Sequence, residues 1–299
     1  MCQENLRHLA KQRRATHLFL GAIRSAMRDN NYKPDSDSPL NIDATQTYYS
    51  EMAWSGELHE QSDVQAQMAL LASIQHMSLA TEDAGRRPPA FLVLVRAALE
   101  ASASAHFLSS PDIGSVAERA RRGLNEMLSA CYYQWRALDQ YGQSDDAAVK
   151  LELMNEWLDR VSSYPDLGPV TRAHERRRPN APYVGDQKPT ISALIDGLFP
   201  SEDGRRFGRW LYAAVSAPSH TEAHGFAIAG AQVLHPDGSQ TVNQEAQLSA
   251  DRVARFTITC LTAVYRAMTS VFTRYGWSWD DIETRCNTAL AAWQQLLQP

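Results

Sequence analysis

Apolar residues recur every three or four positions along most of the chain, which is the spacing of a helix with one buried face. In the first such stretch, at about residues 4–30, Leu20, Ile23 and Met27 mark the apolar side. Further helices are predicted at about residues 43–84, 88–110, 112–141, 144–163, 190–199, 249–275 and 279–297, with another beginning at Ser201. We therefore predict an all-α protein, with an up-and-down helical bundle core and extra N-terminal helices.

Proline, glycine and small polar residues separate these helices. Ser62-Asp63 is a predicted cap within the second stretch. The longest irregular segment, residues 163–189, contains five prolines and the run Arg176–Arg178. A loop of this length inside a domain is usually functional or mobile. A turn sequence within residues 233–242 predicts a small hairpin.

A division near residue 85 would separate an N-terminal helical region, residues 1–85, from a helical bundle of residues 86–299. Both parts have apolar helix faces that need to be covered. We therefore expect the N-terminal region to pack on the bundle and form one compact unit.

Composition excludes several classes of protein. The hydrophobic fraction is 44% and the net charge is -5, so neither disorder nor general binding to polyanions is indicated. The four cysteines form no Cys-x2-Cys pair, and we found no apolar run long enough to span a membrane. We expect a cytoplasmic protein without membrane contact. Arginine dominates the 29 basic residues, which suits phosphate or carboxylate ligands but also follows from a GC-rich genome.

Two charged residues interrupt an otherwise apolar helix. Arg96 and Glu100 are four residues apart, so they share one helix face. Buried charges must be paired. The two residues either form a structural ion pair or line a pocket.

A polar stripe follows in the helix that begins at Ser201. Tyr212, Ser216, His220 and His224 recur every four residues, and Tyr212 and Ser216 should face inward or into a cleft. Pro218 is expected to kink or restart this helix. Ser219 and Glu222 could then cap the new turn.

The spacing of His220 and His224 would let two imidazoles bind one metal ion. Glu222 does not directly follow the first histidine, as it does in zinc proteases, and no third ligand is evident. We predict neither a metal nor a cofactor. Proton transfer or hydrogen bonding by one histidine, and a purely structural pair, both stay open.

The order of the charged and polar motifs in this chain resembles that of uncharacterised actinobacterial helical proteins related to the HEPN superfamily. The resemblance covers about residues 88–275 and rests on four features: Arg96-x3-Glu100, Arg119 with Arg122, Pro189-Thr190, and Tyr212-x3-Ser216-x3-His220. It implies a helical bundle and, in many members, a homodimer. The class includes metal-independent ribonucleases and non-catalytic binders of RNA or nucleotides. The Arg-x4–6-His signature of the nucleases is absent, because Arg209 is the nearest arginine before His220.

Three functions remain open, and the sequence leaves undecided whether any reaction is catalysed. The first is a HEPN-like protein that binds RNA, a nucleotide or another phosphorylated ligand. Its ligand-binding residues would be Arg96, Arg119, Arg122 and Ser216, and its candidate catalytic residues Glu100, Tyr212, His220 and His224. The second is an enzyme acting on a small molecule with His220 and His224, in a pocket lined by Trp54, Trp135, Trp210, Tyr212 and Phe226. The third is a non-enzymatic dimer or interaction module that uses residues 163–189 as its contact.

Overall fold

The structure is a computed structural model. It describes residues 3–45, 55–84, 87–172, 181–199, 201–219, 232–234, 240–242, 248–278 and 280–297. Ten α-helices and two short strand pairs occur in this part of the chain. The prediction of an all-α protein is confirmed.

The helices differ in length, from about two turns to about eight turns. Their bounds are α1 Gln3–Asp29, α2 Pro39–Ala44, α4 Ser55–Asp83, α5 Pro88–Ser109, α6 Val116–Gln140, α7 Ser144–Val161, α8 Ile191–Gly197, α9 Glu202–Ser219, α11 Ala250–Tyr275 and α12 Asp280–Leu297. The single turn η1 spans Pro165–Leu167. Strands β1 (Val170–Thr171) and β2 (Tyr183–Val184) pair antiparallel, as do β3 (Gln232–Leu234) and β4 (Gln240–Val242).

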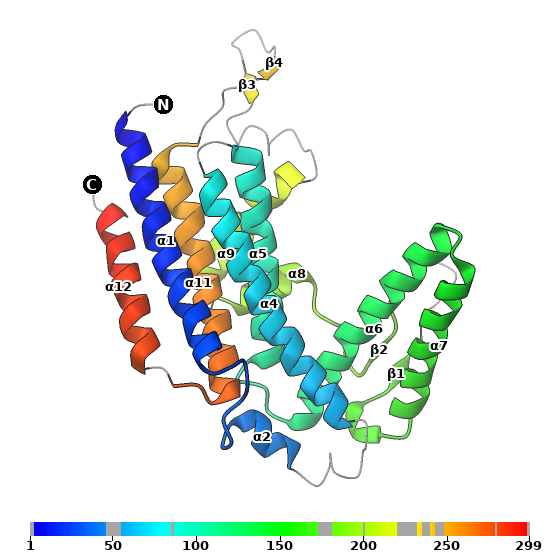
Figure 1. Cartoon of the computed structure of the whole chain (residues 1–299). Helices are drawn as coiled ribbons and strands as arrows, with labels where there is room; N and C mark the ends of the chain where they lie inside the picture. The colour runs from blue at the N-terminus through cyan, green and yellow to red at the C-terminus, as the bar shows by residue number, and fades with distance from the viewer. Residues whose placement is uncertain are drawn as a thin grey trace.

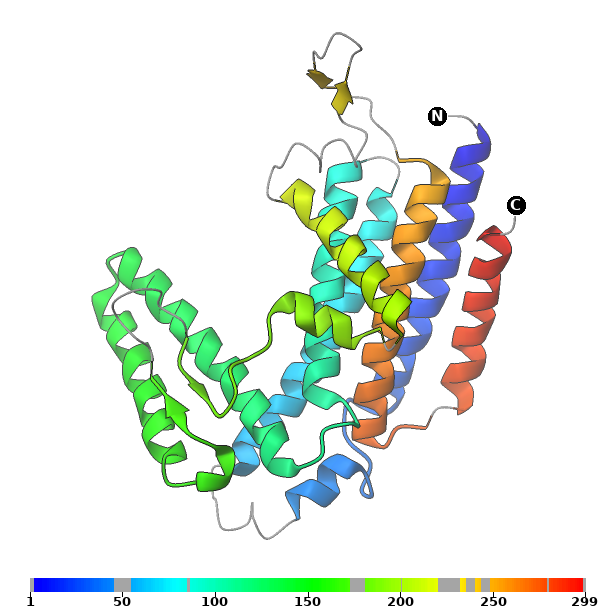
Figure 2. The same cartoon turned by 180° about the vertical axis from the view of Figure 1, so that it is seen from behind.

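Two bodies make up the fold (Figure 1). Helices α1, α4, α5, α11 and α12 run side by side, up and down, in one bundle, and the described chain ends lie at the same end of it. Helices α6 and α7 form an antiparallel arm that leaves the bundle at an angle. From behind, β1 and β2 lie along this arm, while α8 and α9 cover one side of α5, with α9 slanting across it (Figure 2).

The buried apolar side chains form two clusters that match these bodies. The larger cluster contains Phe19, Leu70, Phe91 and Trp293, so helices on both sides of residue 85 share one core. The smaller cluster, around Leu128, joins α6 and α7 to η1 and β2. The boundary between the two hydrophobic cores therefore lies at α6 and not near residue 85.

Helix α5 lies in the middle of the bundle and packs against α4, α8, α9 and α11. Among the described helices, α5 alone is long and apolar enough to cross a membrane by length and composition. Half of its apolar window is buried inside the protein. The only Lys, Arg, Asp or Glu side chains on α5 are Arg96 and Glu100. Their contacts bear on whether they form a structural ion pair or line a pocket.

A close helix crossing attaches the arm to the bundle. A Cβ atom added to Gly123 of α6 would lie 2.5 Å from the Cβ of Ser62 on α4. Real Cβ atoms do not approach so closely, so glycine is needed for this contact. The crossing fixes where α6 leaves the bundle.

Several predicted boundaries were wrong. Ser62 and Asp63 lie inside α4 and cap nothing, because the helix begins at Ser55. Helix α6 begins at Val116 rather than near residue 112, since the Ser115 hydroxyl accepts a hydrogen bond from the Glu118 amide, 3.1 Å away. The short α2 was not predicted.

Some of the predictions made from prolines and turn residues agree with the structure and others do not. Helix α9 continues through Pro218 to Ser219, since a proline in the last turn of a helix leaves most helix hydrogen bonds intact. A new turn capped by Ser219 and Glu222 would fall in residues 220–231, outside the described part of the chain. The hairpin predicted within residues 233–242 is confirmed by the pairing of β3 with β4. The long segment 163–189 contains η1, β1 and β2 but no α-helix among its described residues.

Candidate functional site

Arg96, Glu100 and Tyr212 form a hydrogen-bonded cluster between α5 and α9. The Arg96 Nε donates to Glu100 Oε1 at 2.7 Å, and the Tyr212 hydroxyl donates to the same oxygen at 2.9 Å. The Arg96 guanidinium also lies 5.7 Å from the centre of the Tyr212 ring, within range of a cation–π contact. The sequence predicted that these three residues share a site, and the structure brings them together.

The cluster is partly open to solvent, because the Arg96 side chain is 20% exposed and that of Glu100 is 34% exposed. Burial alone would lower the pKa of Arg96, but the hydrogen bond and charge of Glu100 raise it above its usual value. Burial and the Glu100 carboxylate both raise the pKa of Tyr212. At neutral pH Arg96 is therefore a cation, and the Tyr212 phenol keeps its proton and donates a hydrogen bond to Glu100.

Ser216 follows Tyr212 by one turn on α9 and is partly buried. It forms a hydrogen bond with Tyr212 that lowers the phenol pKa, against the larger effects of burial and Glu100. Tyr212 and Ser216 thus share the flank of α9 that faces α5, as the four-residue spacing predicted. This flank continues the polar cluster toward the C-terminal end of α9.

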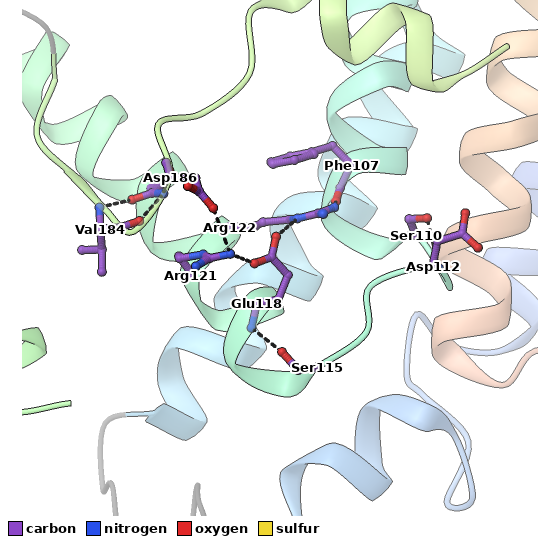
Figure 3. A network of polar contacts seen from close by, with 10 residues as sticks. Phe107, Ser110, Asp112, Ser115, Glu118, Arg121, Arg122, Val184 and Asp186 are labelled. Carbon is purple, nitrogen blue, oxygen red and sulfur yellow. Dashed lines mark hydrogen bonds and ion pairs between the residues drawn. The ribbon is translucent and has the colours of Figure 1, made fainter. Parts of the chain in front are cut away.

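Arg122 links the arm to the C-terminal end of α5 (Figure 3). Its Nη1 donates to the Phe107 carbonyl at 2.8 Å, and its guanidinium lies 4.3 Å from the centre of the Phe107 ring. Its Nε donates to Glu118 Oε1 at 2.8 Å. Burial lowers the pKa of Arg122, whose side chain is 24% exposed. Arg122 is therefore a clamp between two helices, with part of its surface accessible.

Arg121 approaches the same carboxylate from the other side, and its Nη2 forms an ion pair with Glu118 (Figure 3). The same nitrogen is 3.5 Å from Asp186, in the segment that follows β2. Asn125 holds that segment in place, since its side chain bonds the Val184 amide at 2.8 Å and the Val184 carbonyl at 3.1 Å. The first turns of α6 are thus fixed on both sides.

Arg119 is largely buried in a separate network. Its Nε donates to Asp43 Oδ2 at 3.0 Å, and Asp43 also pairs with Arg274 of α11. Burial lowers the pKa of Arg119, and the nearby Arg274 charge lowers it further. Its side chain is 15% exposed and already committed to Asp43. The structure therefore does not bring Arg119 together with Arg96.

Arg96 and Phe107 lie on one face of α5. They are eleven residues apart, close to three full turns, which separates them by about 16 Å along the helix. Because Arg122 stacks on Phe107, this face has one partly exposed arginine near each end. We call it the α5 face, defined by Arg96, Glu100, Phe107 and Arg122.

The predicted histidine pair is outside the residues that the structure describes. His220 and His224 belong to residues 220–231, so neither their geometry nor their distance from Arg96 is described. Arg176–Arg178 is outside the described residues too. Within the described residues, no group of three or more His, Cys, Asp or Glu side chains could hold a metal ion.

Only part of the predicted aromatic pocket falls within the described residues. Trp135 packs on Tyr132 in the core of the arm, with ring centres 5.6 Å apart. Trp210 stacks on Phe256 of the bundle at 6.3 Å and is 56% exposed. Because the two tryptophans pack on different cores, they do not line one pocket. Trp54 and Phe226 are outside the described residues.

His106 is a feature that the sequence patterns did not indicate. Its Nδ1 is 2.7 Å from the hydroxyl of Ser270, and its ring bonds the carbonyl of Gly197. Burial lowers the His106 pKa, as does the charge of Arg266. Although Ser270 and His106 have the contact of a nucleophile and its base, Ser270 is only 2% exposed and cannot reach a substrate. The pair therefore ties α5 to α11. A lone histidine near a helix end gave no sequence signal.

Comparison with known proteins gave no match to a family model, a curated protein or a solved structure.

Proposed function

We propose that the chain is a HEPN-like binding protein that holds RNA, a nucleotide or another phosphorylated ligand on the α5 face. The observation that carries this proposal is the placement of Arg96 and Arg122. Both guanidinium groups are partly exposed, both are oriented by a carboxylate of their own helix, and they lie at opposite ends of the α5 face. Phe107, on which Arg122 stacks, lies about 16 Å from Arg96 along α5, and this spacing suits a ligand longer than a single phosphate.

Arginine suits this role because its planar guanidinium can donate two parallel hydrogen bonds to a phosphate. The bond to Glu100 engages the Arg96 Nε and restricts the side chain before any ligand arrives. Less conformational entropy is then lost on binding. At the other end, the Phe107 ring beneath Arg122 adds an aromatic surface that could contact a base.

Tyr212 adds a donor beside Arg96. Its raised pKa keeps the phenol protonated at neutral pH, so its hydroxyl can donate either to Glu100 or to a ligand oxygen. If the ligand is also cleaved, Glu100 and Tyr212 are the groups near Arg96 that can exchange a proton. His220 and His224 remain candidates for the same role. Arg119 is not part of this proposal, because its side chain is largely buried and already forms an ion pair with Asp43.

The test is a binding titration with a fluorescent ADP analogue and a labelled oligouridine, using wild type, Arg96→Ala and Arg96→Lys. Loss of charge-assisted hydrogen bonds should weaken binding of at least one probe by about 10- to 100-fold in Arg96→Ala. Lysine keeps the charge but not the paired donors, so Arg96→Lys should recover only part of the affinity.

Arg160→Ala is the matched control, because Arg160 forms the same i,i+4 pair with Glu156 on α7 of the arm. Circular dichroism on all variants distinguishes misfolding from the removal of a ligand contact. If wild type binds neither probe, or if Arg96→Ala binds as tightly as Arg160→Ala, the proposal is wrong.

A further inference from the structure

Helix α1 carries a line of cations on its outer face. The helix has six arginine or lysine residues and two acidic residues, although the whole chain has a net charge of -5. Residues spaced alternately four and three apart form one straight stripe along a helix. On α1 these positions are Arg7, Lys11, Arg14, Leu18, Gly21, Ser25 and Arg28, of which Ser25 is partly buried and the others are exposed. We call them the α1 stripe.

The cations of the α1 stripe lack the ion pairs that many other surface arginines form in the described part of the chain. On α7, α9 and α11 the exposed Arg160, Arg206 and Arg255 each pair with an acid four residues earlier. The side chains of Arg7, Lys11, Arg14 and Arg28 form no ion pair or hydrogen bond with any residue in the described part of the chain. Their charge is therefore available to an external anion.

A groove interrupts the row of cations. It has a volume of about 480 Å³ and lies where α12 packs beside α1 (Figure 1). Leu18, Gly21 and Ala22 line it from α1, and Thr288 and Ala289 line it from α12. A Cβ atom added to Gly21 would meet nothing within 4 Å, so the groove is open above this glycine.

We propose that the α1 stripe binds single-stranded nucleic acid, with the phosphates along Arg7, Lys11 and Arg14 and a base or sugar in the groove beside Gly21. Successive cations on the stripe are about 5–6 Å apart, which suits a row of phosphates. The groove is lined by apolar and small side chains together with His17 and Arg28, and this mixture suits the base or sugar of a nucleotide beside its phosphate. The site does not depend on the α5 face, because it uses a different helix.

A strand fits this surface better than a flat anionic membrane does. The cations form a line one residue wide, and the neighbouring α4 presents Glu82, which already pairs with Arg13 and His17 beside the stripe. A membrane would cover that acidic residue together with the cations. A strand that follows α1 contacts a narrower surface, and it comes near Glu82 at the groove, where His17 pairs with Glu82 at 2.9 Å.

The first test reverses the charge of the stripe in the full chain. Fluorescence anisotropy would measure binding of labelled oligothymidine and oligouridine to wild type and to the double variant Lys11→Glu/Arg14→Glu, over a series of salt concentrations. Because the double variant removes two cations that bind phosphates, the slope of log K against log salt should become less steep by about 1.4. The affinity at low salt should fall by about tenfold or more.

The control is Arg160→Glu/Arg255→Glu, which changes the net charge by the same amount on α7 and α11. It should bind the strands within about twofold of wild type. Equal losses of affinity in the two double variants would show a general charge effect and overturn the proposal. Tighter binding to phosphatidylserine vesicles than to either strand, abolished by Lys11→Glu/Arg14→Glu, would assign the stripe to a membrane instead.

The second test fills the groove without changing any charge. Gly21→Leu places a side chain in open space and improves helix propensity, so the protein should stay folded. Strand affinity should fall several-fold in Gly21→Leu and stay near wild type in Gly21→Ala, whose methyl group occupies little of the groove. If Gly21→Leu binds the strands as wild type does, the groove plays no part in binding. In this test Arg96 is intact, so a failure here is distinct from a failure at the α5 face.

Discussion

Arg274 holds both carboxylate oxygens of Asp63 inside the bundle. The Nε–Oδ1 and Nη2–Oδ2 distances are both 3.1 Å, and the two side chains are 1% and 3% exposed. Asp43 pairs with the same arginine and with Arg119, so the network contains two cations and two anions. It connects α2, α4, α6 and α11, and it includes one of the arginines that attach the arm.

Removing one partner from this network should be costly. We expect Asp63→Ala to lower the free energy of unfolding by about 3–5 kcal/mol, because it leaves Arg274 buried without its bidentate partner. Urea unfolding followed by circular dichroism measures the change. Glu156→Ala is the control, since its pair with Arg160 is 49% exposed on both sides and should cost less than about 1 kcal/mol. A loss of less than about 1 kcal/mol in Asp63→Ala would contradict this account.

His106 should make stability depend on pH. Burial and the charges of Arg266 and Arg122 lower its pKa, against an opposing effect of Asp112. The unfolded chain therefore takes up a proton at about pH 6.5, where the folded protein does not. Stability should be fully present above that pH, and it should be lost as the pH falls from there toward the lowered pKa of the folded state.

The measurement is urea unfolding from pH 8 to pH 5, for wild type and His106→Gln. Glutamine keeps a hydrogen-bonding side chain at this position but cannot be protonated, so the variant should lose less stability than wild type as the pH falls. Other histidines contribute equally to both curves, and the difference isolates residue 106. Parallel curves would show that His106 does not carry the effect.

The helices could be predicted from the sequence because their apolar spacing is a local property. The pattern around Leu20, Ile23 and Met27 is enough to identify α1. It also predicted that Arg96 would meet Glu100 one turn later, because that contact needs only helix geometry.

The partners of Arg119 and Arg122 could not be predicted in this way. Arg119 bonds Asp43, 76 residues earlier, and Arg122 bonds the carbonyl of Phe107 on the preceding helix. Sequence spacing contains no information on which helices meet. These contacts show that both arginines help to join the arm to the bundle, which their spacing in the sequence did not indicate. In the same way, the α1 cations without an ion pair among the described residues could be recognised only once the other pairs were known.

Tyr212→Phe isolates the contact between α9 and Glu100. The ring keeps its packing, but the hydroxyl that lies 2.9 Å from Glu100 Oε1 is removed. A hydrogen bond to a charged group contributes about 1.5–3 kcal/mol, and partial exposure of Glu100 places the expected loss near the lower limit. Chemical unfolding measures it. Tyr133→Phe, at a position that is 61% exposed, should change stability by less than about 0.5 kcal/mol. If both variants match wild type, the hydroxyl of Tyr212 does not hold α9 on α5.

The same substitution at two helical glycines should have opposite effects. Gly123→Ala would bring its Cβ to 2.5 Å from the Ser62 Cβ, so α4 and α6 would have to separate. Such overpacking costs about 1–3 kcal/mol. Gly21→Ala meets nothing within 4 Å and should gain up to about 1 kcal/mol from helix propensity alone.

Thermal unfolding of Gly123→Ala and Gly21→Ala beside wild type gives the sign of each change. The gain in helix propensity is the same for both substitutions, because each replaces glycine by alanine inside a helix. A lower melting temperature for Gly123→Ala and a higher one for Gly21→Ala would therefore show that the close contact with Ser62 requires glycine at position 123. The close approach would be refuted if Gly123→Ala were as stable as Gly21→Ala. In that case the arm could leave the bundle at another angle without loss of stability, and the position of Arg122 over Phe107 would have to be maintained by the Arg122 contacts themselves.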